Sequence, residues 1–393
     1  MSGHVRSDKK TLFGAAINPP VFFGSLIVLL SLISTTIIIG EPVEDLFRRV
    51  QANISDAAGW FFILLANLLM FFLIYLAFSK FGKIKLGGAE AKPDFSRISW
   101  FSMLFSAGLG IGLLFYGVAE PIYHFNDNPF VDNTDAIAAA KSAMGITFYH
   151  YGIQAWSIYA TVGLALAFFT FNLKLPLTIR SIFYPLLGDK IYGRWGDLID
   201  IISVIATVVG LATSLGLGAQ QVNAGLEYLF GIGYSREAQI VIIAVITALA
   251  TFSLLAGLDK GIRRLSEVNM GLAMVLLVFV LAIGPTAFLM DSFVQNLGYY
   301  IDNFFKIGLW TESFVGVKDD SNWQNMWTVF YYAWWIAWSP FVGIFIARVS
   351  KGRTITEFIL GVVLVPSLLT FLWMSVFGGS ALYFELLGDH SIT

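Results

Sequence analysis

Nine long apolar stretches constrain the fold of this chain more than any other feature of its sequence. A membrane span needs about 20 mostly apolar residues. The stretches that meet this length are 19–40, 59–79, 99–118, 142–171, 198–230, 238–257, 266–289, 324–347 and 355–378. Of the 393 residues, 57% are hydrophobic and only 13% are charged, about half the charged share of a soluble protein. We therefore expect an all-α polytopic membrane protein.

The lysines and arginines predict which side of the membrane each loop faces. Most of the 24 lie in the N-terminal tail and in every second loop after it, which are 80–97, 174–194, 260–264 and 348–353. Loops rich in Lys and Arg tend to stay in the cytoplasm. The pattern predicts a cytoplasmic N-terminus and, after nine spans, a C-terminus outside.

The composition argues against several other kinds of site. The chain has no cysteine, so disulfides, iron–sulfur clusters and thiolate zinc sites are excluded. The four histidines are scattered without metal-ligand spacing, at His4, His124, His150 and His390. We find no basic patch with interleaved aromatic residues, no nucleophile–base pair and no cofactor loop. We expect neither an enzyme nor a resident cofactor, and no nucleic-acid partner.

One aromatic stretch, 330–343, lies inside an apolar span. Its residues Trp334, Trp335 and Trp338 are three and four apart, so they share one helix face, which Phe341 extends. Aromatic faces attract a quaternary ammonium, and each good cation–π contact contributes about 0.5–2 kcal/mol. The alternative is an aromatic packing face between helices, and this cluster alone does not decide between the two.

The third span contains three closely spaced glycines, Gly108, Gly110 and Gly112. Each costs a helix about 0.5–1 kcal/mol relative to alanine. Close packing of two helices through Gly108 and Gly112 is one interpretation. We favour the other, an unwound segment in mid-membrane, whose carbonyls bind a cation and whose amides face a carboxylate.

Polar side chains in the spans carry less information. We find no Asp, Glu, Lys or Arg in the middle of any span. A proton relay would ordinarily need an intramembrane carboxylate or histidine, so we expect coupling to a metal cation held by neutral oxygens, or no ion coupling. His150 is expected to be a hydrogen-bonded structural residue, and Asp200 to pair with a loop arginine.

Four segments together resemble the betaine/carnitine/choline transporter family: 106–116, 150–159, 206–219 and 333–353. The resemblance runs from about residue 20 to the last residue. It implies a LeuT-like architecture of inverted five-helix repeats, alternating access in the cytoplasmic membrane, and a homotrimer. It divides the chain into four parts: two peripheral spans with the N-terminus (1–98), a first repeat (99–290), an amphipathic connector with an outer loop (291–321), and the start of a second repeat (322–393). Family members continue beyond Thr393, so we expect the chain to stop about three spans short, with the second repeat incomplete.

The resemblance also implies the substrate site. An aromatic box for a trimethylammonium group would consist of Tyr151, Trp156, Tyr159 and Trp335, with Trp334 and Trp338 lining the central site. Tyr151 stands where betaine carriers often have tryptophan. Amides of the segment that contains Gly108, Gly110 and Gly112 would face the substrate carboxylate.

Sodium is the coupling ion that the resemblance implies. Carbonyls of Ser106 and Leu109 match one site, and Thr207 and Phe341 match part of a second. Gly112 is neutral where proton-coupled choline carriers have an acid. We therefore expect sodium-coupled uptake of glycine betaine for osmoprotection. A sodium-independent carnitine/betaine-type exchanger and a truncated, non-transporting betaine-binding membrane protein remain as alternatives.

Overall fold

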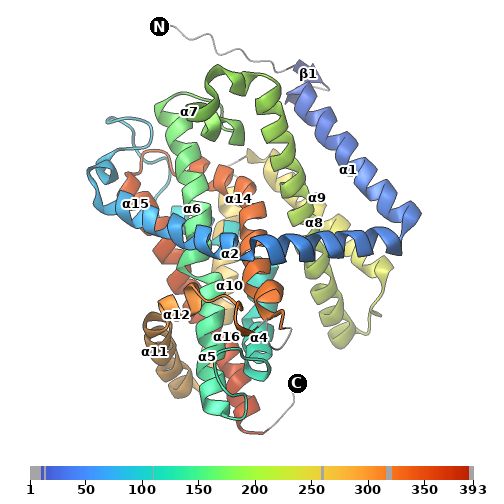
Figure 1. The fold of residues 1–393 in the computed structure, drawn as a ribbon, viewed down its shortest axis with the longest axis vertical. Helices are drawn as coiled ribbons and strands as arrows, with labels where there is room; N and C mark the ends of the chain where they lie inside the picture. The colour runs from blue at the N-terminus through green and yellow to red at the C-terminus, as the bar shows by residue number, and fades with distance from the viewer. Residues whose placement is uncertain (1–9, 13–14, 109, 258–260, 316–320, 389–393) are drawn as a thin grey trace.

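The computed structural model describes residues 10–388 except 13–14, 109, 258–260 and 316–320, and it is almost entirely helical (Figure 1). Strands β1 (Lys10–Leu12) and β2 (Ala15–Ile17) pair antiparallel before the first helix. The helices of the N-terminal half are α1 (Pro19–Ile39), α2 (Glu41–Phe78), α3 (Arg97–Gly108), α4 (Ile111–Asn126), α5 (Ala136–Tyr151), α6 (Ile153–Ala167) and α7 (Tyr184–Leu187).

The second half of the chain is also helical. Its helices are α8 (Arg194–Phe230), α9 (Arg236–Leu255), α10 (Arg263–Ile283), α11 (Thr286–Asp302), α12 (Phe304–Gly308), α14 (Phe330–Val349), α15 (Ile355–Ile359) and α16 (Val365–Leu386). A π-helical turn, Asn325–Val329, leads into α14, and another, Leu360–Leu364, joins α15 to α16.

Within the described residues, eight helices are long and apolar enough to cross a membrane, or nine if α3 and α4 are counted as one bent span. This confirms the expectation of an all-α polytopic membrane protein. Three predicted boundaries differ from the structure by eight residues or more, and one of these is the end of the ninth span, which lies at Leu386 and not at 378. The second span belongs to a helix that already begins at Glu41, and the third continues past residue 118 to Asn126. The expected connector is helical and begins at Thr286.

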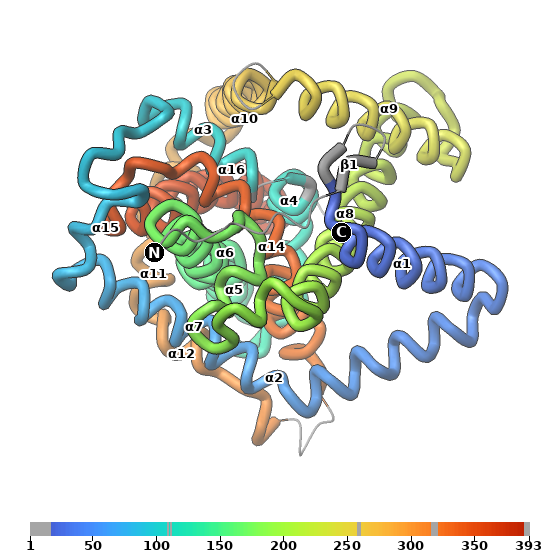
Figure 2. The backbone as a smooth tube through the Cα atoms, turned by 90° about the horizontal axis from the view of Figure 1, so that it is seen from above, coloured from blue at the N-terminus to red at the C-terminus, as the bar shows by residue number. Residues whose placement is uncertain are grey.

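Proline and glycine set the first turn between helices. Pro19 and Pro20 stand at the start of α1, where the missing N–H costs nothing. Gly40 ends α1 with a φ of 70°, a conformation that favours glycine. The chain turns there into α2, and Figure 2 shows the resulting elbow of α1 and α2 at the edge of the molecule.

The centre of the molecule is formed by α4, α5, α6, α14 and α16 (Figure 2). Helices α6 and α14 make the most extensive contact of any pair. Glycines permit this approach, because a Cβ on Gly343 would lie 2.7 Å from Val162 Cγ1 and 3.3 Å from Gly163 N. By contrast, every residue of α9 is at least partly exposed, as expected for helices that face lipid.

Buried ion pairs hold the loops that are rich in basic residues. Arg180 donates from Nε to Asp200 at 2.6 Å and from Nη2 to Asp197 at 2.8 Å. The expected pairing of Asp200 with a loop arginine is therefore confirmed. Arg353 lies 4.6 Å from the centre of the Trp100 ring and pairs with Glu357 at 2.7 Å, which ties the start of α3 to α15.

Replacing Gly343 with alanine tests the contact between α6 and α14. We expect Gly343→Ala to lower the melting temperature in detergent by several degrees, because overpacking costs about 1–3 kcal/mol. Gly271→Ala is the matched control, since a Cβ there meets nothing within 4 Å and alanine favours the helix. Equal melting temperatures for the two variants would contradict the packing described here.

Candidate functional site

A cavity of about 1550 Å³ lies between α3, α4, α6, α8 and α14. Ten of the residues singled out from the sequence line it: Ser106, Gly110, Gly112, Tyr151, Tyr159, Thr207, Trp334, Trp335, Trp338 and Phe341. The cavity also reaches Lys174, Arg180 and Arg348 in the basic loops. The sequence therefore identified most of the aromatic side chains around one central space, but few of its other polar side chains.

The glycine-rich segment breaks the third span, as expected. Helix α3 ends at Gly108, α4 begins at Ile111, and the two are bent by 60°. A Cβ on Gly112 would lie 3.6 Å from Cε1 and from the hydroxyl of Tyr151, so the N-terminus of α4 adjoins the aromatic residues. Leu109 lies outside the described residues, and Gly108 is not among the described residues that line the cavity.

The aromatic residues meet around Trp335. The ring centres of Tyr151 and Tyr159 lie 5.6 and 6.1 Å from that of Trp335. Trp334 stacks on Trp335 at 5.2 Å with an 18° angle between planes. The break at Gly152, between α5 and α6, coincides with a hydrogen bond from Trp335 Nε1 to the carbonyl of His150 at 3.0 Å. This bond fixes the indole ring.

Trp156 does not reach the cavity in the described structure. It is 2% exposed and packs edge-on against Tyr159, with ring centres 5.7 Å apart. It therefore supports the Tyr159 ring from behind. The Tyr159 hydroxyl is buried and, among the described residues, has no hydrogen-bond partner. A buried unpaired hydroxyl costs about 1–3 kcal/mol, so a bound molecule could satisfy it.

Of the four residues expected around a cation, the three whose surroundings the structure describes lie on three helices. Ser106 is on α3 and its hydroxyl donates to the carbonyl of Ser266 at 3.4 Å, while Thr207 is on α8 and Phe341 on α14. All three line the same cavity. Neutral oxygens at a break in a membrane helix are the ligands that sodium uses in carriers of this kind.

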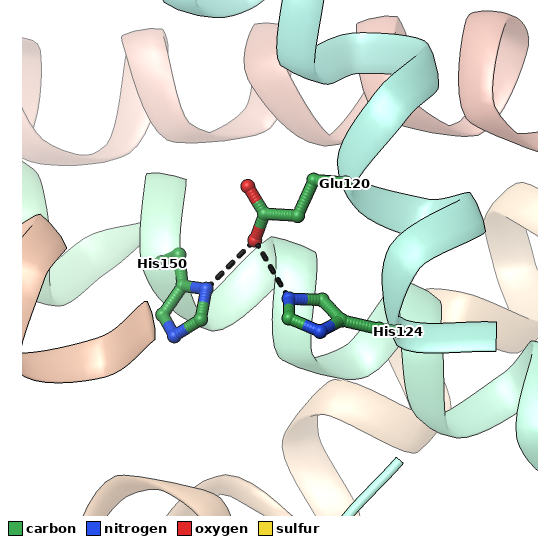
Figure 3. A group of neighbouring side chains, drawn as sticks. All are labelled: Glu120, His124 and His150. Atoms are coloured by element: carbon green, nitrogen blue, oxygen red, sulfur yellow. Dashed lines mark hydrogen bonds and ion pairs between the residues drawn. The ribbon is translucent and has the colours of Figure 1, made fainter. Parts of the chain in front are cut away.

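A fully buried carboxylate near the site was missed. Glu120, His124 and His150 are all 0% exposed (Figure 3). The finding of no charged residue in the middle of a span rested on a third span that ended at 118, whereas α4 continues to Asn126 and carries Glu120 in its buried part. Glu120 and His124 are four residues apart and so share a helix face. If the predicted third span had extended beyond 118, this spacing would have identified a polar face inside the membrane.

Hydrogen bonds connect Glu120 to the aromatic residues. Its Oε1 accepts from His150 Nδ1 at 2.7 Å and from His124 Nε2 at 3.3 Å. Its Oε2 accepts from the Tyr331 hydroxyl at 2.5 Å, and Tyr331 accepts from the Tyr151 hydroxyl at 3.1 Å. His150 is hydrogen-bonded, as expected, and one of its partners is the carboxyl group of Glu120.

The spacing of these three side chains suits a proton better than a metal ion. One atom from each lies within 4.8 Å of the others, a set that a divalent metal can use. However, Glu120 Oε1 and His150 Nδ1 are only 2.7 Å apart. Two ligands on one tetrahedral zinc, each about 2.1 Å from the ion, lie roughly 3.4 Å apart.

Many secondary transporters share a broken helix beside a central cavity within a bundle of membrane-spanning helices, so the fold and the site point to a membrane transport protein. Comparison with known proteins gives the family. Residues 20–393 match the BCCT, betaine/carnitine/choline family transporter, and the chain belongs to this family.

Three relatives illustrate the similarity. The glycine betaine transporter OpuD of Bacillus subtilis is 48% identical over 90% of this chain and 68% of its own length. A glycine betaine transporter of Acinetobacter baylyi is 44% identical over 96% of this chain and 56% of its own. The high-affinity choline transport protein of Escherichia coli is 46% identical over 93% of this chain and 54% of its own.

The family match covers nearly the whole chain. It therefore does not support the expectation that the chain stops three spans short of the family length. This chain spans between about half and two thirds of the length of the three relatives.

Proposed function

We propose that this protein is a secondary active transporter that takes up glycine betaine, or a close analogue, together with sodium. The observation that carries this proposal is the cavity where Trp335, Tyr151 and Tyr159 meet the broken helix at Gly110–Gly112. The substrate would bind there, and the protein would expose it alternately to the two sides of the membrane.

Two neighbouring parts of the cavity wall, the aromatic rings and the start of α4, suit the two charges of a betaine. A trimethylammonium group carries positive charge but has no N–H, so aromatic faces are its natural partners. The N-terminus of α4 lines the same cavity, and a helix N-terminus favours a carboxylate. Trp335, Tyr159 and Tyr151 would hold the ammonium, with Trp156 behind Tyr159, while amides near Gly112 would face the carboxylate.

The shape of the cavity supports an alternating-access mechanism in its inward-open state. The cavity reaches Lys174 and Arg348, which the charge pattern assigns to the cytoplasm. On the other side of the aromatic box, the Tyr331 ring packs against His150 and Trp327, with ring centres 4.8 and 6.3 Å apart. These side chains would form the closed outer gate.

Other features of the proposal come from the family alone. They include the LeuT-like inverted repeats, the homotrimer, a role in osmoprotection, and a location in the bacterial cytoplasmic membrane. The cytoplasmic N-terminus rests on the distribution of lysines and arginines. A sodium-independent carnitine/betaine-type exchanger would use the same aromatic residues. A betaine-binding membrane protein that does not transport would retain binding but show no uptake. Choline is a second candidate substrate, favoured by the buried charge of Glu120 and by the choline carrier among the relatives.

Trp335→Ala tests the aromatic box. We expect betaine affinity to fall at least about tenfold, because one or two good cation–π contacts are lost. Equilibrium binding of radiolabelled glycine betaine to purified protein in nanodiscs measures this. Trp60→Ala is the control, since Trp60 is 59% exposed on α2. Unchanged affinity in Trp335→Ala would contradict the assignment.

Tyr159→Phe tests whether a carboxylate oxygen of the bound substrate accepts a hydrogen bond from the unpaired Tyr159 hydroxyl, while the face of the ring holds the ammonium. We expect a severalfold loss of betaine affinity without loss of thermal stability in the free protein, because no protein partner is lost. Tyr300→Phe should do the reverse. The Tyr300 hydroxyl donates to Gln154 at 3.0 Å outside the cavity, so its removal should lower stability and leave affinity unchanged. Equal effects of the two variants on both quantities would count against the proposal.

Sodium dependence has its own test. We expect betaine affinity to fall when potassium replaces sodium, and Thr207→Val to weaken this sodium effect severalfold by removing a possible ligand. Thr213→Val on the same helix is the matched control, because the Thr213 hydroxyl bonds to its own helix, to the carbonyl of Val209 at 3.1 Å. Sodium-independent binding in the wild type would favour the exchanger instead.

A further inference from the structure

The buried triad Glu120, His124 and His150 has no fixed counter-charge in the described structure. All three side chains are fully buried, and within the described residues Glu120 forms ion pairs only with the two histidines. Burying a carboxylate is costly unless a positive charge compensates it or a proton neutralises it. The triad therefore favours retaining one extra proton.

The hydrogen bonds leave room for that proton. Glu120 lies within hydrogen-bond distance of both histidines and of Tyr331. An ionised carboxylate can only accept, so with Glu120 ionised each histidine has its N–H on the Glu120 side. The second nitrogen of His150 lies 3.0 Å from the Thr328 hydroxyl, which can either donate to it or accept from it. With no extra proton the triad has a net charge of −1, and with one it is neutral.

Within the residues that the structure describes, the side chains next to the triad add no positive charge. On α4, α5, α6 and α14 the other titratable groups are tyrosines and one aspartate: Tyr116, Tyr123 and Asp127 on α4, Tyr149 and Tyr151 on α5, Tyr331 and Tyr332 on α14, and Tyr159 on α6. On α16, which also packs on α4, they are Tyr383 and Glu385 near its end. The triad's own protonation therefore sets the local charge.

Two contacts join the triad to the aromatic box. The Tyr331 hydroxyl bonds to Glu120 on one side and to Tyr151 on the other. His150 also accepts the indole N–H of Trp335 through its carbonyl oxygen. A change of charge or geometry at the triad is therefore felt at two walls of the box.

We propose that the triad is a binding site for one proton, and that its occupancy sets the preference of the box between net-cationic and zwitterionic quaternary ammonium compounds. This inference rests on the proposed function. Without its extra proton the triad is negative and attracts a cation such as choline. With the proton it is neutral and this attraction is lost. The affinity for a zwitterion changes less, because the negative triad attracts its ammonium but repels its carboxylate.

Thermodynamic linkage between choline binding and proton binding gives the direction of the pH effect. Choline and the proton oppose each other at neighbouring sites, so choline binding releases protons and its affinity rises with pH. We expect the affinity for choline to rise about tenfold between about pH 5 and 8, and the affinity for glycine betaine to change clearly less.

Calorimetric titration of the purified chain in nanodiscs tests this at constant sodium. Choline and glycine betaine are titrated across the pH range, in two buffers of different ionisation enthalpy, so that proton release is measured directly. Glu120→Gln should remove both the proton release and the pH dependence of choline affinity. Glu44→Gln should behave as wild type, because Glu44 lies on α2 in an exposed pair with Arg48.

Three results would overturn the proposal. These are choline binding without proton release in the wild type, the same pH dependence for both ligands, or a pH dependence that Glu120→Gln retains. The first two results come from the wild type alone, so the proposal is tested even if the Glu120→Gln variant does not fold. Binding of neither ligand at any pH would instead overturn the proposed function, and this inference with it.

Discussion

The contact between α6 and α14 is the constraint on which the rest of the structure depends. Small residues at Gly163 and Gly343 let the two backbones approach closely. This approach brings Trp335 against Tyr159 on one side, and the break at Gly152 presents Tyr151 and the carbonyl of His150 on the other. The aromatic walls of the cavity are thus a consequence of how two central helices pack.

The helix that follows the glycine-rich break, α4, arranges charge around this contact. The glycine-rich break places the start of α4 at the cavity, where its dipole favours an anion. Nine residues further along the same helix, Glu120 is buried beneath Tyr331. In the proposed binding mode, this helix would offer its partial positive charge to the carboxylate of the substrate and place a titratable carboxyl group near the ammonium.

Sequence reasoning was most reliable where a signal is local. Apolar length predicted the spans, the glycine spacing predicted the break after Gly108, and aromatic spacing found the cavity walls. It failed where partners come from distant segments. Glu120 lies at the end of an apolar window, and its partners His150 and Tyr331 are 30 and 211 residues away. Trp156 has the right spacing but packs behind Tyr159, which only tertiary structure reveals.

The central claim is that aromatic faces recognise the positive charge of a trimethylammonium group, beyond its shape. Competition against radiolabelled glycine betaine by 3,3-dimethylbutanoate, which replaces the charged nitrogen with carbon, tests this most directly. Several cation–π contacts of about 0.5–2 kcal/mol each predict that unlabelled betaine competes at least about tenfold better than the neutral isostere. Equal competition by the two compounds would contradict this account of the site.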